Sequence, residues 1–245
     1  MKKGNKVTLK LGILICDHVN KLLQGEFESY PKMFDDLFSS VEDNLDVKYY
    51  FVIDDQFPKN INECDAYMTS GSQFGANDDL PWIKKLIEFI QTLYHADKPF
   101  IGICFGHQLI AKALGGKVEK STKSWGVGVH TSKIISQKNW MNKDFQEFNL
   151  IVSHQDQISQ LPTGAEVLAS SEFCPYSMIQ VGNHFIGLQG HPEFTLKYSE
   201  SLMEVRKDRI SSAVISKGQK SFLQPLHSKD VMQWLFDFLN YRKSL

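Results

Sequence analysis

Short apolar runs recur along the first half of the chain. They occupy residues 7–15, 47–53, 65–69 and 100–103 and are rich in β-branched and aromatic side chains. Runs of this length and composition are typical of strands that are buried on both faces of a parallel sheet. We therefore expect four such strands in the interior of the protein.

Stretches with helical spacing separate these runs. Residues 31–40 place apolar side chains on one face, and Pro31 suits a first helical turn. A second helix is expected to begin within residues 78–81, with an aspartate as its N-terminal cap, and to bury a face that runs from Ile83 to Tyr94. Alternation of strands and helices predicts a doubly wound, mostly parallel sheet flanked by helices.

The second half of the chain changes character after Gly116. Residues 181–184 have the composition of a tight hairpin turn. Helices are expected over residues 196–210 and about 228–243, the second capped by Ser228, with a loop at 218–227 between them. A smaller antiparallel β portion is predicted from short apolar stretches at residues 126–136, 150–153, 165–170, 177–181 and 184–189. The expected fold class is one α/β domain over residues 1–245, with its core at about 7–210.

Composition narrows the classes of function. The chain has 245 residues, of which 42% are hydrophobic and 22% charged, and its formal net charge is −1. This balance offers no general attraction to nucleic acid or to an anionic membrane, so neither is an expected partner. No apolar run is long enough to span a bilayer, and the polar residues 1–5 do not resemble a signal peptide.

The cysteines argue against a scaffold of disulfides or zinc. Cys16, Cys64, Cys104 and Cys174 lie far apart, without a Cys-x-x-Cys pair, which fits a reducing, cytoplasmic location. The sequence shows no dinucleotide-binding fingerprint and no cluster with metal-ligand spacing, so we expect no metal and no other cofactor.

One cysteine lies at an expected turn between a strand and a helix. Cys104 follows the run at 100–103, is flanked by Gly102 and Gly106, and precedes a helical pattern over 108–114. A nucleophile at such a turn adopts a strained conformation that bulky neighbours would obstruct. The helix also directs its first amides and its positive dipole end at the sulfur, which favours a thiolate. The alternative is a buried structural cysteine, the usual role of a free cysteine without such neighbours.

A second candidate segment lies much later in the chain. A predicted strand ends in a glycine turn that leaves His191 at the strand's carboxyl end, followed by Pro192 and Glu193. His191 can serve as general base and then general acid to Cys104, and Glu193 can fold back to fix the tautomer of the imidazole. The alternative is an ordinary polar turn after an edge strand.

The end of the first predicted strand is a further candidate. Cys16, Asp17 and His18 follow it, and ligands of parallel sheets bind beyond the carboxyl ends of the strands. These residues either line a site or form a polar loop.

Taken together, Phe100–Gly106 with Gln108 and the His191-Pro192-Glu193 segment resemble the class I glutamine amidotransferases, whose triad is Cys-His-Glu. The resemblance runs from the first predicted strand to about Tyr198. It implies a flavodoxin-like sheet and is greatest to stand-alone, GMP-synthase-like members, which include the plant γ-glutamyl peptidases.

The resemblance implies roles for specific residues. Cys104 would attack the γ-carbonyl of glutamine or of another γ-glutamyl small molecule and form a thioester, which water then hydrolyses. The oxyanion would be held by the backbone amide of Phe105 and by that of Gly71 or Ser72. Many members have a second glycine where this chain has Ser72, a change that leaves a backbone donor in place.

Further resemblance concerns substrate contacts. Gln108 would lie beside the γ-carboxamide of the substrate. The segments Trp125-Gly126 and Ser153-His154 would hold its α-amino and α-carboxylate groups. Many members carry Glu-x-Gly before the tryptophan, where this chain has Thr122-Lys123-Ser124, so these fine contacts are expected to differ.

The sequence leaves four functions open. The chain could release ammonia for a separate synthase or acceptor subunit, because it has no Gly-x-x-x-x-Gly-Lys phosphate loop with which to activate an acceptor itself. It could instead be a stand-alone γ-glutamyl peptidase that acts on glutathione-like conjugates. A catalytically silent regulatory or binding relative is the third, and Cys104, His191 and Glu193 together argue against it. The fourth is another cysteine hydrolase of the same broad sheet architecture, in the protease or chaperone-like branch, which usually lacks the His-Pro-Glu placement.

Overall fold

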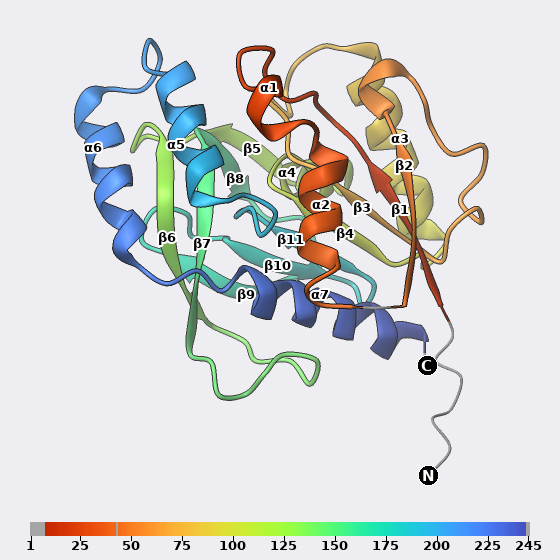
Figure 1. Cartoon of the computed structure of the whole chain (residues 1–245). Helices are drawn as coiled ribbons and strands as arrows, with labels where there is room; N and C mark the ends of the chain where they lie inside the picture. The colour runs from red at the N-terminus through yellow and green to blue at the C-terminus, as the bar shows by residue number, and fades with distance from the viewer. Residues whose placement is uncertain (1–7, 43, 244–245) are drawn as a thin grey trace.

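The protein, obtained as a computed structural model, is built around one mixed nine-stranded sheet (Figure 1). The structure describes residues 8–42 and 44–243, so the polar residues 1–5 and the expected strand start at Val7 lie outside the described residues. The strand order is β2-β1-β3-β4-β11-β10-β9-β6-β7. These strands are β1 (Leu9–Leu14), β2 (Leu45–Tyr50), β3 (Ala66–Thr69), β4 (Phe100–Ile103), β6 (Gly126–Ile134), β7 (Glu147–His154), β9 (Ala165–Ser171), β10 (Met178–Val181) and β11 (Phe185–Leu188).

The sheet changes from parallel to antiparallel at β11. The pairs β2-β1, β1-β3, β3-β4 and β4-β11 are parallel, and the pairs from β11 to β7 are antiparallel. A parallel core followed by an antiparallel portion confirms the predicted fold class. The expected hairpin at 181–184 connects β10 to β11, where Gly182 has a φ of 60°.

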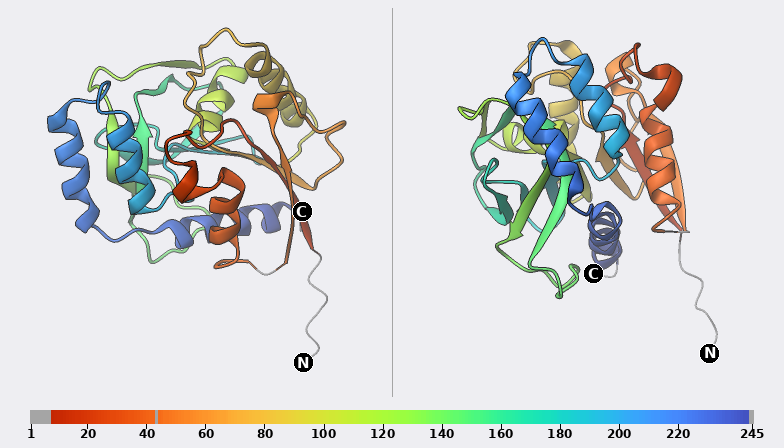
Figure 2. Two further views of the ribbon diagram at one scale, coloured as in Figure 1. Left: turned by 45° about the horizontal axis from the view of Figure 1, so that its top comes forward. Right: turned by 60° about the vertical axis from the view of Figure 1, so that its left-hand side comes forward.

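Helices cover both faces of the sheet (Figure 2). Side chains of α2, α5 and α7 pack into one apolar core with β1, whereas α3 and α4 pack into a second core on the opposite face. Helices α1 and α6 complete the set in the described part of the chain. The helices are α1 (Gln24–Phe27), α2 (Tyr30–Phe38), α3 (Pro81–His95), α4 (Phe105–Ala113), α5 (Leu196–Val205), α6 (Ser212–Lys220) and α7 (Ser228–Lys243).

Several elements differ from the sequence-based expectation. Residues 52–54 form a short 3-10 helix, η1 (Val52–Asp54), instead of extending the second strand. The strands β5 (Lys117–Lys120) and β8 (Asp156–Gln160), which were not predicted, pair in a separate two-stranded sheet. Helix α6 and the 3-10 turn η2 (Ser221–Leu223) occupy part of the expected loop at 218–227.

Both predicted helix caps are wrong in detail. The N-terminal cap of α3 is Leu80, because the Asp78 carboxylate accepts a hydrogen bond from the Gly75 N–H (2.9 Å) and Asp79 pairs with Lys84. Ser228 is the first residue of α7, and its hydroxyl makes no hydrogen bond with the described residues.

The carboxyl ends of the parallel strands meet at one edge of the sheet. Thr69 lies opposite Gly102 in the β3-β4 pair, and Ile103 lies opposite Leu188 in the β4-β11 pair. The segments that follow β3, β4 and β11 are therefore neighbours in space. No helix in the described residues is long and apolar enough to cross a membrane.

Candidate active site

The turn after β4 holds Cys104 in a strained conformation. The cysteine has a φ of 48° and a ψ of −91°, a combination that side chains rarely adopt. A Cβ on Gly102 would lie 2.4 Å from the carbonyl carbon of Gly106, and a Cβ on Gly106 would lie 1.7 Å from Thr69 Oγ1. Glycine is therefore required on both sides of the cysteine by close contact, as the sequence predicts.

His191 and Glu193 form a buried pair beside this turn. Their side chains are 3% and 0% exposed, and His191 Nδ1 lies 2.8 Å from Glu193 Oε1. The Phe194 ring stacks on the imidazole at 3.9 Å between centroids, nearly parallel to it. The His191 N–H donates to the Ile151 carbonyl (2.8 Å), which ties the segment to β7. The imidazole is thus held in one orientation.

The charges around His191 favour its protonated form. Burial lowers the pKa of His191, but the Glu193 carboxylate and the Cys104 sulfur act against burial and together raise that pKa to about 10. Both neighbours act by charge and by hydrogen bonding. At neutral pH the imidazole therefore carries a proton, and its Nδ1–H donates to Glu193.

The loop after β3 lies directly against His191. A Cβ on Gly71 would lie 2.5 Å from His191 Cε1, so only glycine lets the backbone approach this closely. The Ser72 hydroxyl donates to the Cys16 carbonyl (2.9 Å) and accepts from the Phe74 N–H (3.2 Å), so it braces its own loop. Gly71 and Ser72, the expected oxyanion residues, are thus brought to the candidate site.

Phe105, the third expected oxyanion residue, is the first residue of α4. The first N–H groups of a helix have no acceptor within the helix and point along its axis. The Phe105 amide therefore remains available beside Cys104, where the helix dipole also favours negative charge.

In the segment after β1, one expected residue lies at the site and another lies in a polar surface loop. The Asp17 carboxylate is buried and accepts hydrogen bonds from the Gln73 N–H (2.7 Å) and Gln73 Nε2 (3.0 Å), so it anchors the loop that carries Gly71. His18 instead points outward, stacks on Phe51 and pairs with Asp54. Asp17 thus belongs to the site, whereas His18 belongs to the surface.

Gln108 reaches the site indirectly. Its Nε2 donates to the Asp156 carbonyl (2.8 Å) and lies 3.4 Å from Gln189 Oε1. Gln189 Nε2 in turn contacts Cys104 Sγ at 3.4 Å. The two buried amides therefore form a chain that ends on the sulfur.

The other four expected substrate contacts, Trp125, Gly126, Ser153 and His154, lie together at the end of the β6-β7 pair. Gly126 is opposite His154 in that register, and Ser153 is the next residue along β7. Burial lowers the pKa of His154 to about 3, so the ring is neutral, and its Nδ1–H donates to the Asp156 carbonyl (2.9 Å). Residues 122–124, which depart from the family pattern, are exposed.

Three residues near the site were not given roles from the sequence: Gln189, Phe194 and Arg206. Gln189 could have been found, because it follows β11, the parallel neighbour of the strand that precedes Cys104. Phe194 could also have been found, because it directly follows Glu193 and precedes α5. Arg206 comes from the far end of α5, and the sequence carries no local signal for its approach.

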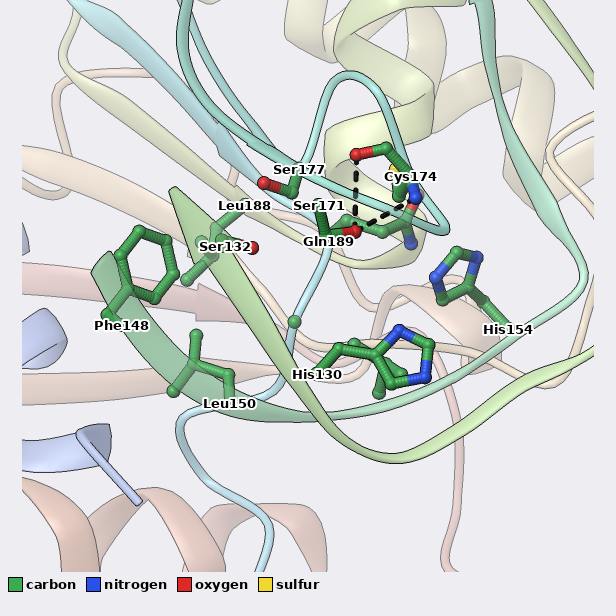
Figure 3. Close-up of a pocket in the computed structure, with 12 residues that line it drawn as sticks. His130, Ser132, Phe148, Leu150, His154, Ser171, Cys174, Ser177, Leu188 and Gln189 are labelled. Carbon is green, nitrogen blue, oxygen red and sulfur yellow. Dashed lines mark hydrogen bonds between the residues drawn. The ribbon is translucent and has the colours of Figure 1, made fainter. Parts of the chain in front are cut away.

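A small, partly open cavity lies beside this group (Figure 3). His130, His154, Cys174 and Gln189 are among the residues that line it. Its volume of about 10 Å³ has room for about one water molecule and not for a substrate. In the described part of the chain no three His, Cys, Asp or Glu side chains are grouped as metal ligands.

Comparisons with known proteins identify the family of the chain. The family model "Glutamine amidotransferase class-I" matches residues 41–206. γ-Glutamyl peptidase 3 of Arabidopsis thaliana is 33% identical over 208 residues, which cover 82% of this chain and 81% of that protein. A glutamine-hydrolysing GMP synthase subunit from Sulfolobus acidocaldarius is 31% identical over 157 residues, 64% of this chain and 80% of that protein.

A solved glutamine amidotransferase from Thermotoga maritima superimposes with a TM-score of 0.73 at 21% identity, covering 96% of this chain and 97% of that one. The chain belongs to the class I glutamine amidotransferase family.

Proposed function

We propose that the protein hydrolyses a γ-glutamyl amide bond through a thioester on Cys104. The observation that carries this proposal is the buried His191–Glu193 pair, 2.8 Å apart, beside a cysteine in a strained turn. Such an arrangement keeps a proton on the imidazole and a negative charge favourable on the sulfur.

The first half of the reaction forms the thioester. The sulfur of Cys104 attacks the γ-carbonyl carbon, and the carbonyl oxygen becomes an oxyanion held by the amides of Phe105 and of Gly71 or Ser72. His191 then gives its proton to the leaving nitrogen as the C–N bond breaks. One such oxyanion donor is commonly worth about 3 kcal/mol of the barrier.

The second half of the reaction releases glutamate. Neutral His191 takes a proton from water, whose oxygen attacks the thioester carbonyl, and the sulfur leaves as the thiolate. Glu193 remains ionised throughout and holds the ring orientation.

Two fates of the leaving nitrogen distinguish the candidate activities. The relatives named γ-glutamyl peptidases favour a stand-alone hydrolase of γ-glutamyl peptides. In that reaction the leaving nitrogen becomes the free amino group of the remaining peptide or amino acid. The relatives named as glutamine-hydrolysing GMP synthase subunits favour a glutaminase that supplies ammonia to a synthase partner. Both use the same bond and the same residues.

A substrate panel tests the proposal. Glutamine, glutathione, a glutathione S-conjugate and simple γ-glutamyl amides are incubated with the wild-type protein and with Cys104→Ala, and both glutamate and ammonia are measured. We expect hydrolysis of at least one substrate and its loss in Cys104→Ala. Unchanged hydrolysis in that variant would refute the thioester, and inactivity of the wild type on every substrate, with or without cell extract, would favour a silent binding relative.

A further inference from the structure

A buried guanidinium lies against two of the segments expected to contact substrate. Arg206 caps the C-terminus of α5, which packs against β6 and β7 (Figure 2). Arg206 is 9% exposed, and its Nη1 donates to Ser153 Oγ (2.8 Å). The guanidinium also lies over the Trp125 ring, 5.7 Å from its centroid. The side chain therefore joins two of the segments expected to contact substrate.

This cation lacks an ionic partner. Among residues 8–42 and 44–243, no carboxylate lies within ion-pair distance of Arg206. The charge of Asp17 reaches it from farther away, but the Asp17 oxygens are already occupied by Gln73 and His18. Burial and the nearby Arg209 both lower the pKa of Arg206. A buried charge without a partner is costly, which indicates that an anion completes the site when it binds.

The neighbours of Arg206 are hydrogen-bond donors. Burial raises the pKa of Tyr30 and of Tyr198, so both phenols stay neutral and keep their protons. Each interacts electrostatically with Arg206, as does the Cys104 sulfur. The two phenols hydrogen-bond to each other, so one hydroxyl proton is left to donate. That hydroxyl and the guanidinium suit the two oxygens of a carboxylate. Ser153, which accepts from Arg206, lies two residues along β7 from Ile151, whose carbonyl accepts from the His191 N–H. An anion on Arg206 would therefore lie near the proposed base.

We propose that Arg206 binds a carboxylate of the substrate and thereby selects anionic γ-glutamyl compounds. The proposal rests on the proposed function and names a determinant of its specificity. A γ-glutamyl dipeptide carries two such groups, one on the α-carbon of the γ-glutamyl residue and one on the leaving amino acid. The guanidinium fork binds either in the same way, so the experiment must separate them.

The test compares three substrates. γ-Glutamylglycine carries both carboxylates, γ-glutamylglycine amide lacks the one on glycine, and the α-carboxamide of γ-glutamylglycine lacks the one on the γ-glutamyl residue. For the wild type, we expect neutralisation of the recognised carboxylate to lower kcat/KM on the order of 10- to 100-fold, mainly through KM. The substrate that loses activity identifies the carboxylate.

Substitutions connect that loss to Arg206. Arg206→Gln should lower kcat/KM for γ-glutamylglycine by about the same factor and leave the poorly used neutralised substrate unchanged. Arg206→Lys retains the positive charge without the planar guanidinium fork, so its kcat/KM for γ-glutamylglycine should lie between those of the wild type and of Arg206→Gln. Lys207→Gln is the matched control, because Lys207 is exposed and pairs with Glu204. We expect this control to change kcat/KM by less than about twofold for all three substrates.

Two results would overturn the proposal. One is equal hydrolysis of all three substrates by the wild-type protein. This measurement does not depend on the folding of any variant. The other is an Arg206→Gln protein that loses activity equally on all three, as expected of a structural role.

A binding measurement separates this proposal from the proposed function. In the Cys104→Ala background, calorimetry with the three compounds should show affinity that depends on one carboxylate and on Arg206. If the wild type hydrolyses nothing but this dependence is found, the proposed function fails and the carboxylate site stands. If binding is equal for the three compounds or undetectable, the carboxylate site is refuted.

Discussion

Replacing Glu193 with Gln separates the charge of this residue from its shape. The glutamine side chain has nearly the same volume and can still accept a hydrogen bond from His191 Nδ1–H. What it removes is the negative charge 2.8 Å from the imidazole, in a pair that is almost fully buried. We expect the substitution to lower the pKa of His191 markedly while leaving the turn at Cys104 intact.

The expected size follows from the geometry. The nearest atoms of the two groups are 2.8 Å apart, but both charges are delocalised, so we take their centres to be about 4 Å apart. Two unit charges at that distance interact by about 4 kcal/mol at an effective dielectric constant of about 20. That energy corresponds to a change of about three in pKa. The substitution should therefore move the pKa of His191 from about 10 to roughly 7.

Proton and carbon NMR of histidine labelled at Cε1 measures this directly. In the wild type, the His191 signal should stay in its protonated position up to about pH 9, whereas in Glu193→Gln it should titrate near neutrality. His191→Asn assigns the signal, and Glu204→Gln is a control, because Glu204 is an exposed partner of Lys207. A wild-type His191 that titrates near pH 6.5, or a Glu193→Gln signal that does not move, would refute the electrostatic account.

The same pair has a consequence for stability. Because the folded pKa of His191 lies above its unfolded value, its contribution is fully present below pH 6.5 and is lost as pH rises towards about 10. Urea midpoints should therefore decline from neutral to alkaline pH more in the wild type than in Glu193→Gln. An equal decline in both proteins would contradict this linkage.

Two further predictions concern packing and acid stability. Gly106→Ala places a Cβ 1.7 Å from Thr69 Oγ1 and should lower the free energy of unfolding, measured by urea denaturation, by about 3 kcal/mol. The control Gly25→Ala has nothing within 4 Å of its new Cβ and should change this free energy by at most about 1 kcal/mol. Equal effects of the two substitutions would contradict the clash. Burial holds the pKa of His107 and of His154 at about 3. Below pH 6.5 these histidines bind protons in the unfolded chain but not in the folded one. Each of them should therefore lower the free energy of unfolding by about 1.4 kcal/mol per pH unit, down to about pH 4. His154→Gln should make the acid decline of the urea midpoint less steep, and an unaltered slope would be evidence against this cause.

The sequence was most informative where structure is decided locally. The strand, the paired glycines and the helix around Cys104 are neighbours in the chain, so their joint pattern predicts the strained turn and its close contacts. His191 could be associated with Cys104 because both follow strands of one parallel sheet, whose carboxyl ends share an edge. The catalytic roles themselves remain predictions.

Where packing between distant segments decides, the sequence carried little signal. Helix α6 was missed because residues 212–220 have few apolar side chains and include Gly218. The glycine is there for packing, since a Cβ at this position would lie 2.9 Å from Val127. Asp78 resembled a cap but its carboxylate binds the loop before it. Arg206 reaches Ser153 from a helix that begins after the last predicted motif, and no local spacing predicts that contact.

The parallel pairing of β4 with β11 also has a consequence for biosynthesis. Phe100 pairs with Phe185, a residue 85 positions later in the chain. At about 5–20 residues per second, the ribosome needs roughly 4–17 s to make that intervening stretch. Throughout this interval the apolar β4 segment has an unpaired edge, which is the kind of surface that recruits other strands. The nascent protein is therefore expected to depend on chaperone protection late in translation, before its nucleophile has acquired a base.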